Sequence, residues 1–186
     1  MIYPIVLYGD PVLRKKATDI STDYPKLDKL IESMFETMYD CEGVGLAAPQ
    51  IGVSIRLFVI DTTPFADKDE NAQGFKKVFI NAYVKEEMGE QWKFNEGCLS
   101  IPGIREDVER KQAIHVKYLD ENFEEHEEFF DGMIARVIQH EYDHIDGVLF
   151  TDKLNPLRKR LIKGRLNDIS KGITDADYKV RIPQRK

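Results

Sequence analysis

Two histidines separated by three residues form the clearest chemical signal in this chain. The run Gln139–His144 reads Q-H-E-Y-D-H and contains the pattern H-E-x-x-H. Residues four apart share one face of an α-helix, so His140 and His144 can present two imidazoles to one metal ion. Glu141 follows the first histidine, where a carboxylate can accept a proton from a metal-bound water. The same short pattern also arises by chance in helices whose histidines are simply core or surface residues.

The sequence around this pattern predicts a helix that is buried on one side. Asp131 is a suitable N-cap and Gly147 a suitable residue just past the C-terminal end. A buried glutamate between two histidines is unfavourable unless a positive charge lies nearby, and a metal ion supplies one. The residues that recur at helical spacing on the expected buried side are Ile134, Val137, Ile138, Glu141 and Ile145.

A catalytic metal site usually has three protein ligands and one open position. Zinc peptidases with this helix commonly take the third ligand from a downstream Glu or His, but neither residue type follows His144. Upstream, Cys98 is a soft thiolate donor in a glycine-flanked loop, and Cys41 is the available fourth ligand for a closed structural site. We favour a Cys-His-His set with an open position. The downstream acidic alternatives are Asp146, Asp152, Asp168, Asp175 and Asp177.

Composition describes an ordinary globular protein that fits one domain. The chain has 186 residues, is 42% hydrophobic and 32% charged, and carries a formal net charge of −6. The negative charge argues against a general nucleic-acid binder, so we expect no DNA partner. Without an apolar run near 18 residues or a signal-peptide pattern, we expect a cytoplasmic protein with no membrane partner.

The spacing of apolar residues predicts the helices and strands that must position the candidate metal ligands. Asn155 is expected to cap a last helix, with a stripe that includes Leu157 and Leu161 and with several basic residues on its other faces. His115 and His126 lie in expected strands and are interpreted as structural. We assign 1–169 to a single catalytic domain and 170–186 to a polar, poorly ordered tail. Other expected elements are a helix over 25–40 and strands over 55–60, 78–84, 87–94, 113–119 and 123–130.

Three blocks of the sequence together resemble the signature motifs of the peptide deformylase family. They are Gly43–Gln50 (G-V-G-L-A-A-P-Q), Glu96–Ser100 (E-G-C-L-S) and Gln139–His144, in the family's order. Gly9–Arg14 also resembles the family's N-terminal segment, so the likeness extends from about Ile2 to the last helix. The resemblance implies an α+β fold with antiparallel β-sheets packed around a central metal-binding helix, followed by a C-terminal helix.

The resemblance also implies a reaction. Peptide deformylases remove the formyl group from the N-terminal formylmethionine of newly made proteins and release formate. By resemblance, Cys98, His140 and His144 bind one divalent metal, natively Fe²⁺, with Zn²⁺, Ni²⁺ or Co²⁺ in purified protein. Metal-bound hydroxide then attacks the formyl carbon, with Glu141 as general base and acid. The developing oxyanion is stabilised by the Gln50 amide and the Leu99 backbone N–H.

Substrate contacts follow from the same likeness. Gly45 matches a position whose backbone pairs with the extended peptide, and small glycines permit such an approach. Arg136 either borders the pocket or forms a surface ion pair. The residues proposed by motif offset for the methionine pocket, each with a core role as the competing interpretation, are Val44, Phe94, Met133 and Val137.

Partners and rival functions complete the prediction. Nascent formylmethionyl peptides are the expected substrates, and the basic last helix is either a ribosome contact or a solvated face. The rival functions are an H-E-x-x-H zinc endopeptidase with a downstream aspartate ligand and a non-catalytic metal-binding module.

Overall fold

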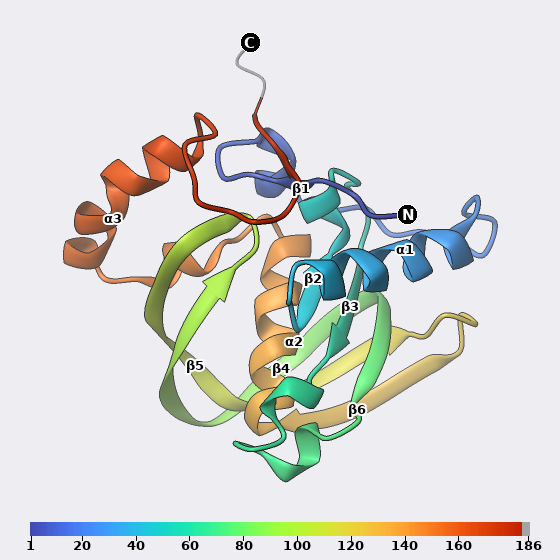
Figure 1. The fold of residues 1–186 in the computed structure, drawn as a ribbon. Coiled ribbons are helices and arrows are strands. Elements are labelled where there is room, and N and C mark those ends of the chain that lie inside the picture. The colour runs from blue at the N-terminus through green and yellow to red at the C-terminus, as the bar shows by residue number, and fades with distance from the viewer. Residues whose placement is uncertain (184–186) are drawn as a thin grey trace.

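The computed structural model describes residues 1–183, in which one helix is enclosed by a strongly curved antiparallel sheet (Figure 1). The five-stranded sheet has the order β2-β3-β4-β5-β6, and β1 pairs with β7 in a separate parallel pair. The helices are α1 Leu27–Asp40, α2 Gly132–Ile145 and α3 Pro156–Ile169. The strands are β1 Ile5–Val6, β2 Gly45–Ala47, β3 Leu57–Asp61, β4 Lys76–Cys98, β5 Ile101–Leu119, β6 Glu125–Asp131 and β7 Val180–Arg181.

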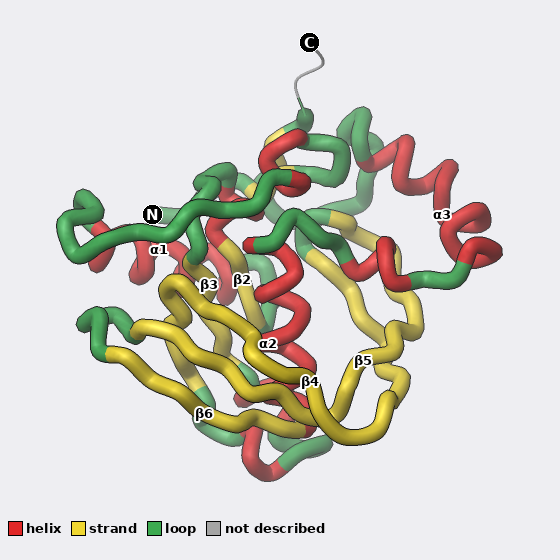
Figure 2. The backbone as a smooth tube through the Cα atoms, turned by 180° about the vertical axis from the view of Figure 1, so that it is seen from behind, coloured by secondary structure: helices red, strands yellow, loops and turns green. Residues whose placement is uncertain are grey.

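The α2 helix lies at the centre of the molecule, with β4 and β5 curving past it on one side and β2 and β3 on the other (Figures 1 and 2). It contacts β2, β3, β5 and β6. Ala135, Ile138 and Ile145 have no exposed surface, as the apolar period predicts. Arg136, Gln139 and other polar residues of α2 are buried too, so each needs a partner inside the protein. The expected α+β class, with a sheet around this helix and a C-terminal helix, is confirmed.

The two short strands expected over 78–84 and 87–94 are instead parts of the single long strand β4. Its pairing with β5 continues through register shifts, one of them between Met88 and Gln91 around Gly89, whose φ is +78°. Bulges bend a strand and increase its twist, which lets one hairpin wrap around α2. The sequence suggests a break because Gly89 is a turn residue; pairing with β5 maintains the strand across it.

The strands expected over 113–119 and 123–130 correspond to part of β5 and to β6, which pair antiparallel as a hairpin across 120–124. His115 stacks on Phe129 at a centroid distance of 4.1 Å, and His126 bonds the carboxylate of Asp120 at 2.8 Å. Both histidines therefore have local partners on the sheet, away from the other two histidines.

The C-terminal helix begins as expected, with the Asn155 side chain accepting a hydrogen bond from the Arg158 N–H. Its apolar stripe is shorter than predicted. Ile162, Leu166 and Ile169 are buried against a core cluster of β5, but Leu157 and Leu161 are 64% and 61% exposed. The expectation that these two leucines belong to the buried stripe is wrong, because the first half of α3 extends beyond the sheet (Figure 1).

The segment after α3 corrects the expectation of a poorly ordered tail. The chain turns at the end of α3 and returns to the body of the molecule, where β7 pairs in parallel with β1. The Ile5 N–H donates to the Lys179 carbonyl at 2.8 Å, and the Leu7 N–H donates to the Arg181 carbonyl at 3.1 Å. The final part of the expected tail, 184–186, lies outside the described residues. Among the described residues, no helix has the length and apolar composition needed to cross a membrane.

Candidate metal centre and active site

The α2 helix brings His140 and His144 to the same side, one turn apart. Their ring centroids are 5.1 Å apart and the ring planes cross at 73°. His144 is buried and His140 is half-buried at the wall of a cleft. The local i, i+4 geometry thus delivers two imidazoles to one place, as the sequence predicts.

Cys98, the last residue of β4, supplies a third donor atom beside them. Its Sγ lies 3.3 Å from His144 Nε2, and the donor atoms of the three residues all lie within 4.8 Å of one another. In a tetrahedral zinc site, a sulfur and a nitrogen ligand bound at about 2.3 and 2.0 Å are roughly 3.5 Å apart. The S,N,N donor set and its spacing therefore fit one divalent metal ion.

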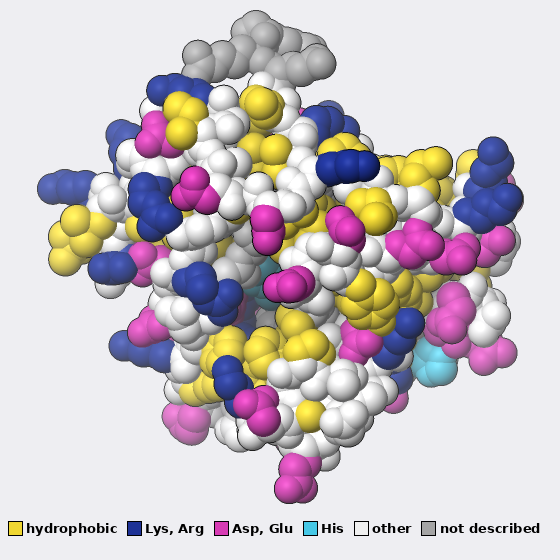
Figure 3. All heavy atoms as spheres, viewed as in Figure 1, with side chains coloured by type: hydrophobic (Ala, Val, Ile, Leu, Met, Phe, Trp, Pro, Cys, Tyr) yellow, Lys and Arg dark blue, Asp and Glu magenta, His cyan; other side chains and the backbone are white. Residues whose placement is uncertain are grey.

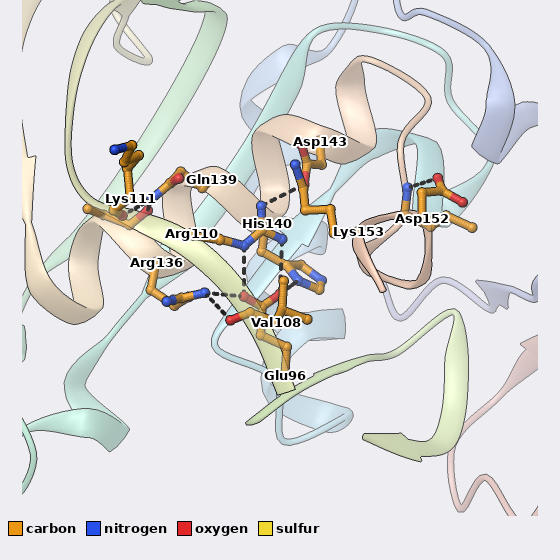
Figure 4. Close-up of polar contacts among 12 residues, drawn as sticks. Glu96, Val108, Arg110, Lys111, Arg136, Gln139, His140, Asp143, Asp152 and Lys153 are labelled. Carbon is orange, nitrogen blue, oxygen red and sulfur yellow. Dashed lines mark hydrogen bonds and ion pairs between the residues drawn. The ribbon is translucent and has the colours of Figure 1, made fainter. Parts of the chain in front are cut away.

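A buried carboxylate organises the surroundings of this cluster (Figure 4). Glu96 accepts two hydrogen bonds from Arg110, at 2.7 and 2.9 Å, and one from Arg136 at 2.9 Å. Its Oε2 also lies 3.0 Å from His140 Nδ1. Burial alone would raise the pKa of Glu96, but the bonds from His140 and Arg110 outweigh burial and hold that pKa well below its ordinary value.

The bond to Glu96 decides which nitrogen of His140 is available. With Nδ1 donating to the carboxylate, Nε2 is the nitrogen that faces Cys98 and that can coordinate a metal once it has lost its proton. Burial lowers the pKa of His140, but Cys98 and Glu96 more than offset it and hold that pKa well above its ordinary value. Burial lowers the pKa of His144, so that ring is neutral. A metal ion bound at Nε2 would take the place of the second ring proton beside the Glu96 carboxylate.

Glu141 lies in the same cleft but in a contrasting environment. It is buried, and its Oε2 has no hydrogen-bond partner among the described residues. Burial raises the pKa of Glu141 to about 7. Its side chain passes so close to β2 that a Cβ added to Gly45 would lie 2.4 Å from Glu141 Oε1. This carboxyl can therefore both accept and release a proton near neutral pH, and only glycine fits beside it.

Gln50 and Leu99 face the cluster from two separate segments. Gln50 lies in the short 3-10 helix Ala48–Ile51, and its Oε1 accepts a hydrogen bond from the Ala47 N–H at 2.8 Å. This bond fixes the amide so that Nε2 approaches Cys98 Sγ at 3.5 Å. Leu99 follows Cys98 in the turn between β4 and β5 and lines the cleft.

A cleft of about 650 Å³ is lined by Gln50, Glu96, Cys98, Leu99, His140 and Glu141, and the buried His144 adjoins it through Cys98. Figure 3 shows a histidine inside a hollow that has acidic and basic side chains at its edge. The structure thus brings the expected metal-binding, proton-transfer and peptide-contacting residues into one region. The residues expected to contact substrate that line this cleft are Val44, Gly45, Phe94, Met133 and Val137.

The sequence does not predict the contributions of Glu96, of Arg110 and of the C-terminal segment to this region. Glu96 lies in one of the motifs, but neither it nor Arg110 can be assigned a role from the sequence, because a buried pair between two strands leaves no local sequence signal. Arg136 borders the cleft and is also ion-paired, but inside the protein and not at the surface. The third contribution comes from Asp175–Tyr178 of the C-terminal segment, which also lines the cleft.

Two of the alternative third ligands, Asp146 and Asp152, have other partners. Asp146 bonds Arg56 at 2.6 Å, and Asp152 bonds Arg14 at 2.5 Å. Within residues 1–183, the donor group around the two histidines contains Cys98 and none of the downstream aspartates; Cys41 is not part of it. The geometry therefore disfavours both the downstream-aspartate arrangement and a four-ligand site with Cys41.

Substitution of the two cysteines tests this donor set. We expect Cys98→Ala to lose the divalent metal that the wild-type chain binds, because a thiolate ligand is removed. Cys41→Ala is the matched control and should keep the metal. Metal content after anaerobic loading and dialysis measures the difference. Retention of the metal by Cys98→Ala, or its loss from Cys41→Ala alone, would contradict the assignment.

Comparison with known proteins agrees with this geometry. A family model described as polypeptide deformylase matches residues 2–160. The chain is 58% identical to a peptide deformylase from Christiangramia forsetii, over 100% of this chain and 98% of the relative. It is 56% identical to the Flavobacterium johnsoniae peptide deformylase, with the same coverage. A crystal structure of a peptide deformylase from Legionella pneumophila superimposes with a TM-score of 0.79 at 41% identity, covering 90% of this chain and 95% of the other. The chain therefore belongs to the polypeptide deformylase family, a class of enzymes that act on formyl-methionyl peptides.

Proposed function

We propose that this protein removes the N-formyl group from the N-terminal formylmethionine of nascent proteins and releases formate. The observation that supports this most directly is the buried Glu141, whose unpartnered Oε2 lies in a cleft beside a Cys-His-His donor cluster. Family membership supports the same reaction. The proposal assigns the protein to the cytoplasm, where ribosomes release formylated chains.

Cys98, His140 and His144 are the residues that would hold one divalent metal ion. We propose Fe²⁺ as the native ion, with Zn²⁺, Ni²⁺ or Co²⁺ in purified protein, since each accepts sulfur and imidazole donors. When bound, such an ion supplies Lewis acidity, which makes a water molecule more acidic and polarises a carbonyl oxygen. Glu96 contributes by orienting the His140 ring through Nδ1.

Glu141 is proposed to move the proton. A carboxyl group whose pKa is raised by burial to about 7 is suited to accept a proton from water and then to return it to the departing amine. The unpartnered Oε2 is the atom we assign to this transfer, because no donor among the described residues competes for it. Gly45, which has no Cβ, leaves room for the carboxyl group at this position.

Two donors are proposed to stabilise the oxygen of the formyl group as it gains charge. They are Gln50 Nε2, oriented by the bond between its own Oε1 and the Ala47 N–H, and the backbone N–H of Leu99. Such donors are effective because they are already positioned before the reaction, and losing one typically costs roughly 3 kcal/mol of barrier.

The cleft supports an extended peptide with an apolar first side chain. Val44, Met133 and Val137 provide aliphatic and thioether surface, and Phe94 adds an aromatic wall with Phe65, whose ring lies edge-on to it at 5.9 Å. We assign this region to the methionine side chain. Gly45, with no Cβ, leaves its backbone open to pair with the substrate backbone.

A ribosome contact through α3 is a further part of the proposal. Of its cations, Arg158 is held by Glu106, and Arg165 bonds the Gly103 carbonyl. The remaining cations on α3 are Lys159, Arg160 and Lys163, which are exposed and have neither an ion pair nor a side-chain hydrogen bond among the described residues. They share the projecting part of the helix with the two exposed leucines, a surface suited to the phosphate backbone of RNA.

Replacement of Glu141 tests the reaction. Glu141→Gln keeps the size of the side chain but cannot accept the proton, so we expect formate release from a formyl-methionyl peptide to fall about 10² to 10⁴-fold with metal retained. Glu32→Gln on the exposed face of α1 is the control. Undiminished release would refute the role of Glu141. Cleavage of internal peptide bonds without formate release would indicate an endopeptidase, and metal binding without either activity would indicate a binding module.

Gly45→Ala tests the close packing beside Glu141. The new Cβ would meet the Glu141 carboxylate, so we expect a loss of about 10²-fold in kcat/KM with metal content unchanged. Gly164→Ala is the matched control, because a Cβ at this position in α3 meets nothing within 4 Å. It should keep full activity and gain about 0.5–1 kcal/mol in stability, measured by urea unfolding. Equal activities of the two variants would contradict the packing argument.

The triple variant Lys159→Glu, Arg160→Glu, Lys163→Glu tests the ribosome contact. We expect it to lose co-sedimentation with ribosomes at low salt while releasing formate from a free peptide at the wild-type rate. Asp28→Lys with Glu32→Lys, on α1, is the control for altered surface charge. Co-sedimentation that is unchanged in the triple variant would remove this part of the proposal.

A further inference from the structure

The C-terminal segment forms part of the wall of the substrate cleft, although it is far from the motifs in sequence. After α3 the chain passes back across the front of the molecule to β1 (Figure 1). Along this path Asp175, Asp177 and Tyr178 line the same cleft as the metal-binding cluster. Pairing of β7 with β1 fixes the segment on its C-terminal side.

Tyr178 connects this segment to the turn between β4 and β5. Its hydroxyl donates a hydrogen bond of 2.8 Å to the Leu99 carbonyl, and its ring packs against the same core cluster as the Leu99 side chain. Leu99 directly follows the metal-binding Cys98. The segment is therefore fixed beside the Cys-His-His cluster by a hydrogen bond and by packing.

The wall gives the cleft an excess of negative charge. Asp175 and Asp177 are exposed, and neither has an ion pair among the described residues. Glu42 adds a third exposed carboxylate to the lining.

The cations of the cleft do not balance this charge. Of the two arginines in the lining, Arg136 is neutralised by Glu96. Arg105 directs its donors to the side-chain and backbone oxygens of Asn95. No lysine belongs to the described lining. The open part of the cleft therefore carries three carboxylates against one guanidinium.

The interior of the cleft independently indicates that a ligand enters it, because the nine-tenths buried Glu141 presents an unpartnered oxygen there. Building on the proposed deformylation, we propose that Asp175 and Asp177 determine substrate specificity, favouring formyl-methionyl peptides with a basic residue after the methionine over those with an acidic residue. Tyr178 acts by holding these two carboxylates at the cleft.

The size and salt dependence of this preference follow from the exposure of the carboxylates. Exposed charge pairs contribute modestly, so we expect kcat/KM to differ about fivefold between lysine and glutamate peptides at low salt. The Debye length falls from about 10 Å at 0.1 M salt to about 3 Å at 1 M, so the preference should nearly vanish at 1 M. A preference that depended on packing would persist.

The experiment measures formate release by the metal-loaded full-length protein from two peptide series, formyl-Met-Xaa-Ala and formyl-Met-Ala-Xaa. Xaa is lysine, glutamine or glutamate. We expect the order lysine, glutamine, glutamate in at least one series, mainly through KM. In Asp175→Asn with Asp177→Asn, the lysine-to-glutamate ratio should fall towards one, and in Asp175→Lys with Asp177→Lys it should invert.

Asp28→Asn with Glu32→Gln is the matched control, because it removes two exposed charges from α1, away from the cleft lining. It should keep the wild-type ratio. Equal kcat/KM across each series, or a preference that survives both paired substitutions, overturns the proposal. The glutamine peptides separate this result from failure of the proposed function: release from them without charge preference defeats only the specificity, whereas no release from any peptide defeats the deformylation.

Discussion

The buried carboxylate of Glu96 is the constraint on which the rest of the site depends. A charge removed from water is strongly unfavourable unless it is paired and hydrogen-bonded. Glu96 meets this requirement with Arg110 from β5 and with Arg136 and His140 from α2. The same contacts fix the position of β4 relative to α2. Since Cys98 lies two residues further along β4, the network that stabilises the charge of Glu96 also sets the distance between the cysteine sulfur and the imidazoles.

Two buried glutamates near the Cys-His-His donor cluster have opposite properties because their neighbours differ. Glu96 is surrounded by donors, which lower its pKa and keep it charged. Glu141 is buried without a partner for Oε2, and its pKa rises to about 7. When the environments of two carboxyl groups move their pKa values apart, the charged group can orient a neighbouring side chain and the other group can transfer protons. The glycine at position 45 adds to this difference, since it leaves Glu141 room but no hydrogen-bonding side chain.

The sequence by itself determined the features that depend on local periodicity and on three motifs. The i, i+4 spacing of His140 and His144 identified the central helix, and the alternation before and after 120–122 identified the β5–β6 hairpin. The choice of Cys98 did not follow from spacing alone, because Asp and Cys alternatives were open. The need for three ligands and an open position favoured it, and resemblance to a family supported that choice. The same resemblance selected the cleft residues, which the structure then brings together.

Tertiary structure decided what depends on contacts distant in sequence. β4 continues through Gly89 because β5 pairs with it, and Leu157 stays exposed because no element of the described chain covers that part of α3. Residues 170–183 have the polar composition of a tail, but pairing with β1 and the bond from Tyr178 to Leu99 order them at the cleft. The local sequence shows whether a segment has the 3.6-residue period of a helix or the two-residue period of a strand. It does not carry the identity of a strand that lies more than 170 residues away, so the acidic wall of the cleft became visible only in the folded chain.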